Sequence, residues 1–145
     1  MQIFLGAPFT QDINENTKIM SSQKTNIITG LMEYLENRGH VVKNAHSREK
    51  FGKDLMHPLV CTKKDFNEVK NCDLFLAIVG NPPSGGVHIE LGWASALDKK
   101  IILLLHEGFD YSPLVSGLSS VTNAKIIRFK NEKDIPRLLD GAIWK

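Results

Sequence analysis

Residues 74–95 read LFLAIVGNPPSGGVHIELGWAS, and the interpretation of the whole chain starts from them. The unbroken apolar run at 74–79 predicts a strand covered on both faces, and the segment after Gly86 predicts an amphipathic helix. The loop between them contains Ser84 and paired glycines, and Glu90 follows in the first turns of the helix. The stretch therefore brings a hydroxyl, backbone amides and a carboxylate to the carboxyl end of a strand, where they could hold an anion beside a nucleophile.

Apolar runs of strand length alternate with helical patterns along the chain. Strands are predicted at residues 2–6, 40–44, 74–79, 100–105 and 125–129. Helices are predicted between the first two strands, where apolar residues recur at helical spacing (Ile27, Ile28, Leu31, Met32, Leu35) before Gly39, and at 59–71 and 134–144. This alternation predicts an α/β fold with a doubly wound five-stranded parallel sheet, in a single domain spanning residues 1–145. Ligands of such sheets bind outside the carboxyl ends of the strands, where segments 6–10, 44–52 and 80–90 and the stretch after Leu105 should meet.

The composition narrows the class of protein. The chain has 145 residues, 42% of them hydrophobic, and a formal net charge of +2, which is too small to indicate binding to nucleic acid or to a membrane. Its start lacks a basic region and a long apolar core, so no signal peptide is predicted, and no segment is long and apolar enough for a membrane span. The two cysteines, Cys61 and Cys72, match no metal spacing and predict reduced thiols. We therefore expect a cytoplasmic protein.

Glu90 and the loop before it each allow two interpretations. The segment from Ser84 to Val87 matches neither a Walker loop nor a dinucleotide fingerprint, so it is either a phosphate-holding turn or an ordinary turn with Ser84 as the helix N-cap. Glu90 is either a glutamate favoured by the helix dipole or a nucleophile that attacks an anomeric carbon.

Asp65, His46, Arg48 and His88 are the other candidates. Asp65 lies in the middle of a predicted helix, where it either pairs with a neighbouring lysine on a solvated face or supplies a second carboxylate to the cleft. His46 and Arg48 follow the second strand and could reach an anion, whereas His88 could pack or bond locally. No zinc spacing and no Ser-His-Asp pattern is present, so neither a metal nor a cofactor is predicted.

Over nearly its whole length the chain resembles the nucleoside 2-deoxyribosyltransferase-like N-glycosidases. The matching motifs are the opening FLGAPF at 4–9, the helical Asp65, the strand after Asp73 and the pattern S-x-G-x-x-x-E-L-G-x-A at 84–94. Within that family the chain is most similar to the hydrolases of nucleoside-antibiotic pathways that cleave CMP or 5-hydroxymethyl-CMP. That closer match is carried by residues 44–49, 88–95, 110–111 and 114–118.

The resemblance implies a flavodoxin-like sheet, Glu90 as nucleophile and Asp65 as the residue that handles the leaving base. It also implies a pyrimidine nucleotide as substrate, and a homodimer or larger oligomer with shared active sites. The implied substrate-binding residues are Phe4, Gly6, Pro8, Phe9, Thr10, His46, Arg48, Ser84, Gly86, His88 and, from the neighbouring subunit, Ser112. Thr10 departs from the pattern, because some CMP-type hydrolases have an arginine there. Because of this departure at Thr10, the resemblance leaves open which pyrimidine base the protein prefers.

Ser84 bears on the choice between nucleotides and nucleosides. Phosphate-handling members of the family place a serine at this position, and transferases for unphosphorylated nucleosides place an aspartate, which would repel a phosphate dianion. Ser84 thus favours a nucleotide, and the resemblance implies hydrolysis of CMP or 5-hydroxymethyl-CMP to free base and ribose 5-phosphate. The alternatives are a nucleoside 2-deoxyribosyltransferase, a 2′-deoxynucleoside 5′-monophosphate hydrolase and a non-catalytic nucleotide sensor.

Overall fold

The five predicted strands form one parallel sheet. The computed structural model describes residues 1–9 and 12–143. The strands are β1 (Gln2–Gly6), β2 (Val41–Lys43), β3 (Leu74–Ile78), β4 (Lys100–His106) and β5 (Ala124–Phe129), and all neighbouring pairs are parallel. β2 is shorter than predicted, because Asn44 caps the following helix instead of extending the strand.

The strand order is β2-β1-β3-β4-β5. The chain moves outward in one direction from β1 to β2 and in the other from β3 to β5, so the order reverses between β1 and β3. This is the flavodoxin-like order, and its switch point is where such sheets bind ligands. The prediction of a doubly wound α/β fold is confirmed.

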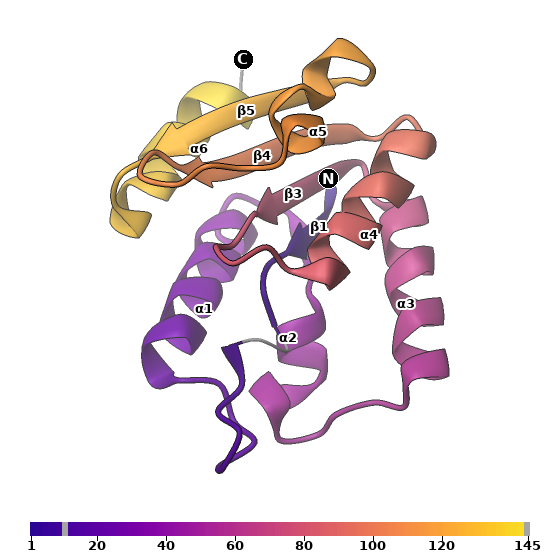
Figure 1. The fold of residues 1–145 in the computed structure, drawn as a ribbon, viewed down its shortest axis with the longest axis vertical. Coiled ribbons are helices and arrows are strands. Elements are labelled where there is room, and N and C mark those ends of the chain that lie inside the picture. Colours follow the sequence, from indigo (N-terminus) through magenta and orange to yellow (C-terminus); the bar gives the residue numbers. More distant parts are fainter. Residues whose placement is uncertain (10–11, 144–145) are drawn as a thin grey trace.

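Helices cover both faces of the sheet. The last four residues of β1 are all buried, so both of its faces must be covered. Leu5 packs in a cluster with residues of α1 (Ser22–Glu36) and α6 (Ile135–Ile143). Phe4 points to the opposite face, where α3 (Pro58–Asn71) and α4 (Gly85–Ala96) contribute the packing residues. Figure 1 shows α1 on one side of the strands and α3 and α4 on the other.

The predicted helix limits need small corrections. α1 starts at Ser22, with Ser21 as N-cap. Gly39 closes this helix at the C′ position, as its place after the apolar pattern predicts: its φ is 80°, its amide donates to the Glu36 carbonyl at 2.9 Å, and the His40 amide donates to the Leu35 carbonyl at 3.3 Å. α6 ends at Ile143 within the described residues; the predicted end, Trp144, lies outside them.

Several short elements were not predicted. They are α2 (Ala45–Arg48), η2 (Lys50–Gly52), α5 (Pro113–Ser116), η3 (Leu118–Ser120) and η4 (Glu132–Asp134). α2 and η2 follow β2 at the carboxyl edge of the sheet, and α2 lies between α1 and α3 in Figure 1. A Cβ on Gly52 would lie 2.6 Å from the Lys18 carbonyl oxygen, and its φ is 98°, so only glycine fits there. Among the described helices, none has the length and apolar character needed to cross a membrane.

Candidate active site

A cavity of about 710 Å³ opens at the carboxyl ends of β1, β2 and β3. Its walls come from the loops after these strands and from α2, α3 and α4. Of the residues predicted from sequence, it brings together Gly6, Phe9, His46, Asp65, Ser84, Gly86 and Glu90. Three of the four segments predicted to meet at this edge thus contribute to the cavity. The stretch after Leu105 does not, because His106 and Phe109 line a separate pocket.

Glu90 lines this cavity, with its carboxylate beside Gly6 at the end of β1. Its Oε2 atom is 3.0 Å from the point that a Cβ on Gly6 would occupy, so glycine lets the carboxylate approach the strand. The pKa of Glu90 is raised from 4.5 to about 8, first by loss of hydration and then by the negative charge of Asp65. Arg48 opposes this shift, and Glu68 adds to it. Glu90 therefore holds its proton more tightly than an exposed glutamate does.

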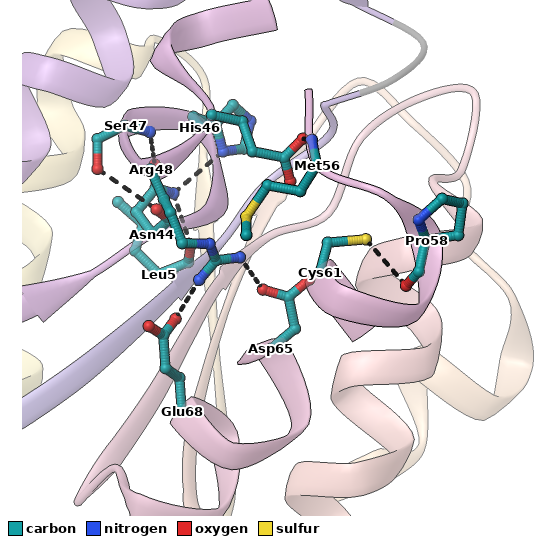
Figure 2. Close-up of polar contacts among 11 residues, drawn as sticks. Leu5, Asn44, His46, Ser47, Arg48, Met56, Pro58, Cys61, Asp65 and Glu68 are labelled. Carbon is teal, nitrogen blue, oxygen red and sulfur yellow. Dashed lines mark hydrogen bonds and ion pairs between the residues drawn. The ribbon is translucent and has the colours of Figure 1, made fainter. Parts of the chain in front are cut away.

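Arg48 joins two carboxylates of α3 from the end of α2. Its Nη2 donates to Asp65 Oδ1 and its Nη1 donates to Glu68 Oε2, the second bond being 2.6 Å long. Figure 2 shows the guanidinium between the two acids. Burial raises the pKa of Asp65 although the contact with Arg48 lowers it. Asp65 is therefore a cavity carboxyl fixed in place by an arginine, and its pairing with a neighbouring lysine is not observed.

His46 is buried, and both ring nitrogens bond within the protein. Nε2 lies 2.8 Å from the Pro8 carbonyl oxygen, and Nδ1 lies 3.1 Å from the Asn44 amide nitrogen. Asn44 also donates to the Leu5 carbonyl at 2.8 Å, so its nitrogen faces both groups as a donor. His46 is consequently neutral, with the proton on Nε2, and desolvation lowers its pKa. Its ring supports Phe9, with the two ring centroids 4.6 Å apart.

The loop between β3 and α4 also lines the cavity, beside the carboxyl end of β3. Ser84 is the N-cap of α4, and its Oγ accepts a bond from the Val87 amide at 3.5 Å. The hydroxyl hydrogen stays available to a ligand, and the amides of Gly85 and Gly86 belong to the first turn, whose N–H groups have no partner within a helix. The two interpretations of Ser84 are therefore compatible, because the N-cap geometry leaves the hydroxyl hydrogen and the first amides of α4 able to bond an anion.

The remaining predicted residues lie outside the cavity. Phe4 is buried against Phe75, with centroids 5.8 Å apart, and Pro8 contributes its carbonyl to His46. His88 and Ser112 line a separate groove of about 420 Å³ between α4 and α5. Thr10 falls outside the described residues. Asp73 accepts a bond from the Gln2 amide at 2.7 Å and so connects the starts of β3 and β1.

Other cavity residues were not among the predicted binding residues. They are Leu5, Ala7, Ile13, Ala45, Glu49, Leu55, Met56, Pro58, Cys61, Thr62, Gly85, Val87, Ile89 and Trp93. Trp93 packs edge-on against Phe66, with centroids 5.3 Å apart. The cavity position of Cys61 could have been predicted from sequence. It lies four residues before Asp65 in a predicted helix, and residues i and i+4 share a helix face. Within the described part of the chain, no group of His, Cys, Asp and Glu is placed to hold a metal ion.

The raised pKa of Glu90 predicts a pH-dependent cost in stability. Between about pH 4.5 and 8 the folded protein holds a proton that the unfolded chain releases, so the free energy of unfolding falls as pH rises through this window. Glu90→Gln stays neutral, and we expect it to unfold at a higher temperature than wild type near pH 8 but at a similar temperature near pH 5. Thermal unfolding by circular dichroism checks this, with exposed Glu36→Gln as control. If the unfolding temperatures of Glu90→Gln and wild type differed equally at pH 5 and pH 8, the raised pKa of Glu90 would be contradicted.

Comparisons with known proteins agree with this geometry. Neither a protein-family model nor a curated protein matches the chain. A solved structure titled as a Clostridium botulinum CMP N-glycosidase, BcmB, is 37% identical, with TM-score 0.73, and the match covers 97% of this chain and 99% of that one. The solution structure of BlsM is 38% identical, with TM-score 0.83 and coverage of 98% and 88%.

A more distant structure shares the fold. It is a 2-deoxyribosyltransferase from Bacillus psychrosaccharolyticus, 22% identical with TM-score 0.63, and the match covers 94% of this chain and 90% of that one. The identity and coverage of the first two structures establish more than a common fold. The chain therefore belongs to the nucleoside 2-deoxyribosyltransferase-like N-glycosidases, enzymes that hydrolyse or transfer at N-glycosyl bonds.

Proposed function

We propose that the protein hydrolyses the N-glycosidic bond of a pyrimidine nucleoside 5′-monophosphate, CMP or 5-hydroxymethyl-CMP, to free base and ribose 5-phosphate. The observation that carries this proposal is the cavity, which brings the first amides of α4 and the Ser84 hydroxyl together with the Glu90 carboxyl. The similarity to a CMP N-glycosidase supports the same substrate class.

The strand order gives the substrate a direction in the cavity. The phosphate end follows β3, Glu90 touches the end of β1 at Gly6, and the end nearest β2 contains Phe9, His46 and Met56. A phosphate on Ser84 and Gly86 therefore places the sugar over Glu90 and the base toward β2. Phosphate binding away from the reacting bond orients C1′, so the unphosphorylated nucleoside should react poorly.

In the proposed mechanism Glu90 is the nucleophile. Its carboxylate attacks C1′ while the bond from C1′ to the base nitrogen breaks, and the bonding electrons leave with the base through an oxocarbenium-like transition state. Asp65, whose pKa burial raises, gives a proton to the departing base. Water then attacks C1′, transfers a proton to Asp65 and breaks the ester, which releases ribose 5-phosphate and restores Glu90.

In this proposal Arg48 and His46 do not contact the reacting atoms, and each holds another residue in position. Arg48 faces Asp65 and Glu68, so we assign it to positioning Asp65. His46, bonded to Pro8 and Asn44, holds the loop that presents Phe9 to the base. Phe4 lies in the core beneath the cavity, where it supports β1.

Arg48→Met is expected to lower kcat/KM about tenfold and to move the acid limb of its pH profile upward. Asp65 loses the partner that orients it, and Glu90 loses the positive charge that lowers its pKa. Steady-state assays across pH check this, with Arg137→Met, exposed on α6, as the control. An unchanged profile would remove Arg48 from the scheme; circular dichroism verifies that the variant is folded.

We also propose that two copies share their active sites, with Ser112 of the neighbouring subunit completing the phosphate end. Ser112 is exposed at the start of α5, beside His88 and the 83% exposed Leu114, on a surface able to meet a second copy. Mixing Glu90→Ala with Ser112→Ala tests this, because shared sites would restore activity that neither variant has alone. Lack of recovery in a mixed dimer would contradict it.

The test of the function is chromatographic detection of free base from CMP, 5-hydroxymethyl-CMP, dCMP and cytidine. Release from the ribonucleoside monophosphates alone supports the proposal and ranks its two substrates. Preference for dCMP would assign a 2′-deoxynucleoside monophosphate hydrolase. Transfer to added adenine from a deoxynucleoside would assign a deoxyribosyltransferase, and binding without turnover would assign a sensor.

A further inference from the structure

The end of the cavity nearest β2 contains a buried carboxylate with an unused oxygen. Glu49 is 5% exposed, lines the cavity and accepts one side-chain hydrogen bond, from the Met56 amide to its Oε2 at 3.2 Å. Among the described residues, Glu49 Oε1 has no hydrogen bond or ion pair. A buried carboxylate held by one neutral donor is costly unless a ligand supplies another donor.

The position of Glu49 in the fold identifies the part of the substrate it would meet. Glu49 ends α2, after β2, whereas Ser84 follows β3, and β1 lies between these two strands. The two ends of the cavity are thus separated by two strand spacings, about 10 Å. With the phosphate on Ser84 and C1′ at Glu90, the far end receives the base atoms most distant from the glycosidic bond. In a pyrimidine joined through N1, that atom set is C4 and its substituent.

The chemistry of Glu49 selects one C4 substituent over another. An ionised carboxylate only accepts hydrogen bonds, and cytosine carries an amino group at C4, whereas uracil carries a carbonyl oxygen. Carboxylate acceptance from the cytosine amino group is a known recognition pair. Uracil would leave two acceptors facing each other in a site with little water, and a site built to bond a donor rejects an analogue without it.

We propose that Glu49 is the specificity-determining residue of this enzyme, accepting a hydrogen bond from the exocyclic amino group of the base. This inference rests on the proposed function and names the substrate feature that the site recognises. A 5-hydroxymethyl group offers a second donor of the same kind, so the experiment separates the two. A purely structural role, holding the loop through Met56, would leave the preference between bases unchanged.

The experiment compares kcat/KM for CMP, UMP, 5-hydroxymethyl-CMP and a CMP analogue with hydrogen in place of the amino group. Wild type is expected to favour CMP over UMP and over the analogue by roughly 10- to 100-fold. Glu49→Gln can keep the Met56 bond through its amide oxygen and offer an N–H to uracil. The ratio of CMP to UMP is therefore expected to fall at least about tenfold in this variant, and exposed Glu36→Gln should leave it unchanged.

Three results would overturn the inference. They are equal wild-type rates for CMP and UMP, a ratio in Glu49→Gln within about twofold of wild type, and a change confined to the preference for the hydroxymethyl group. If Glu49→Gln does not fold, the wild-type comparison of CMP with its analogue decides alone. If no nucleotide releases base, the proposed hydrolase fails by itself, and the relative affinity of CMP and UMP for the wild-type protein, measured by calorimetry, tests Glu49 independently.

Discussion

Glu90→Ala is expected to lower kcat for nucleotide hydrolysis on the order of 10³-fold or more. In the proposed mechanism this carboxylate forms the covalent bond to C1′, and it is the Glu90 carboxylate that lies against Gly6 at the end of β1. The loss should appear in kcat with little change in substrate affinity, because phosphate contacts at Ser84 remain. Base release by chromatography measures it, and Glu36→Ala, on the exposed surface of α1, is the matched control.

The covalent intermediate gives this prediction a second readout. Wild-type protein quenched in acid during turnover should carry the added mass of a ribosyl 5-phosphate, located on the peptide that contains Glu90. Glu90→Gln, which keeps the size of the side chain, should carry none. Turnover within about tenfold of wild type in Glu90→Ala would refute the nucleophile assignment.

The sheet could be predicted because its central strands are unambiguous in sequence. β3 (LFLAI) is entirely apolar, β4 (KIILLLH) has five consecutive Ile and Leu residues, and these residues are largely buried on both faces of the sheet. Once these strands are placed, topology brings Ser84 and Glu90 to the carboxyl edge. The side-chain direction of Phe4 was harder, because an aromatic residue in a buried strand can face either layer. Packing against Phe75 settles it.

The structure of the cavity end nearest β2 could not be predicted from sequence. Its backbone has no recognisable local pattern, and its ion pairs join residues far apart in the chain. α2 is only four residues long and has no periodicity to detect. Lys50 and Phe51 adopt positive φ, which sequence rarely indicates for residues other than glycine. Glu49 stands between Arg48 and Lys50 and reads as part of a solvated charged segment, yet it is buried. Arg48 finds its partners 17 and 20 residues away, in another helix.

Ser84→Asp is expected to lower kcat/KM for the nucleoside monophosphate by roughly 100-fold and to raise it for the matching nucleoside. An aspartate at this position would face the phosphate dianion, and a repulsion of about 3 kcal/mol in a partly dry site accounts for that factor. The nucleoside has a 5′-hydroxyl instead, which can donate to the new carboxylate. Parallel assays of CMP and cytidine measure the change.

Ser84→Asp is informative because it changes the charge that faces the phosphate and keeps a side chain that can cap α4. Aspartate is as good an N-cap as serine, so the bond to the Val87 amide and the start of α4 should survive the substitution. Ser22→Asp places the same charge in the first turn of α1, away from the cavity, and should leave both activities unchanged. If Ser84→Asp lowers CMP and cytidine turnover equally, the serine supports the helix alone and the phosphate binds elsewhere. If the two activities move in opposite directions, the charge at this residue selects between nucleotide and nucleoside.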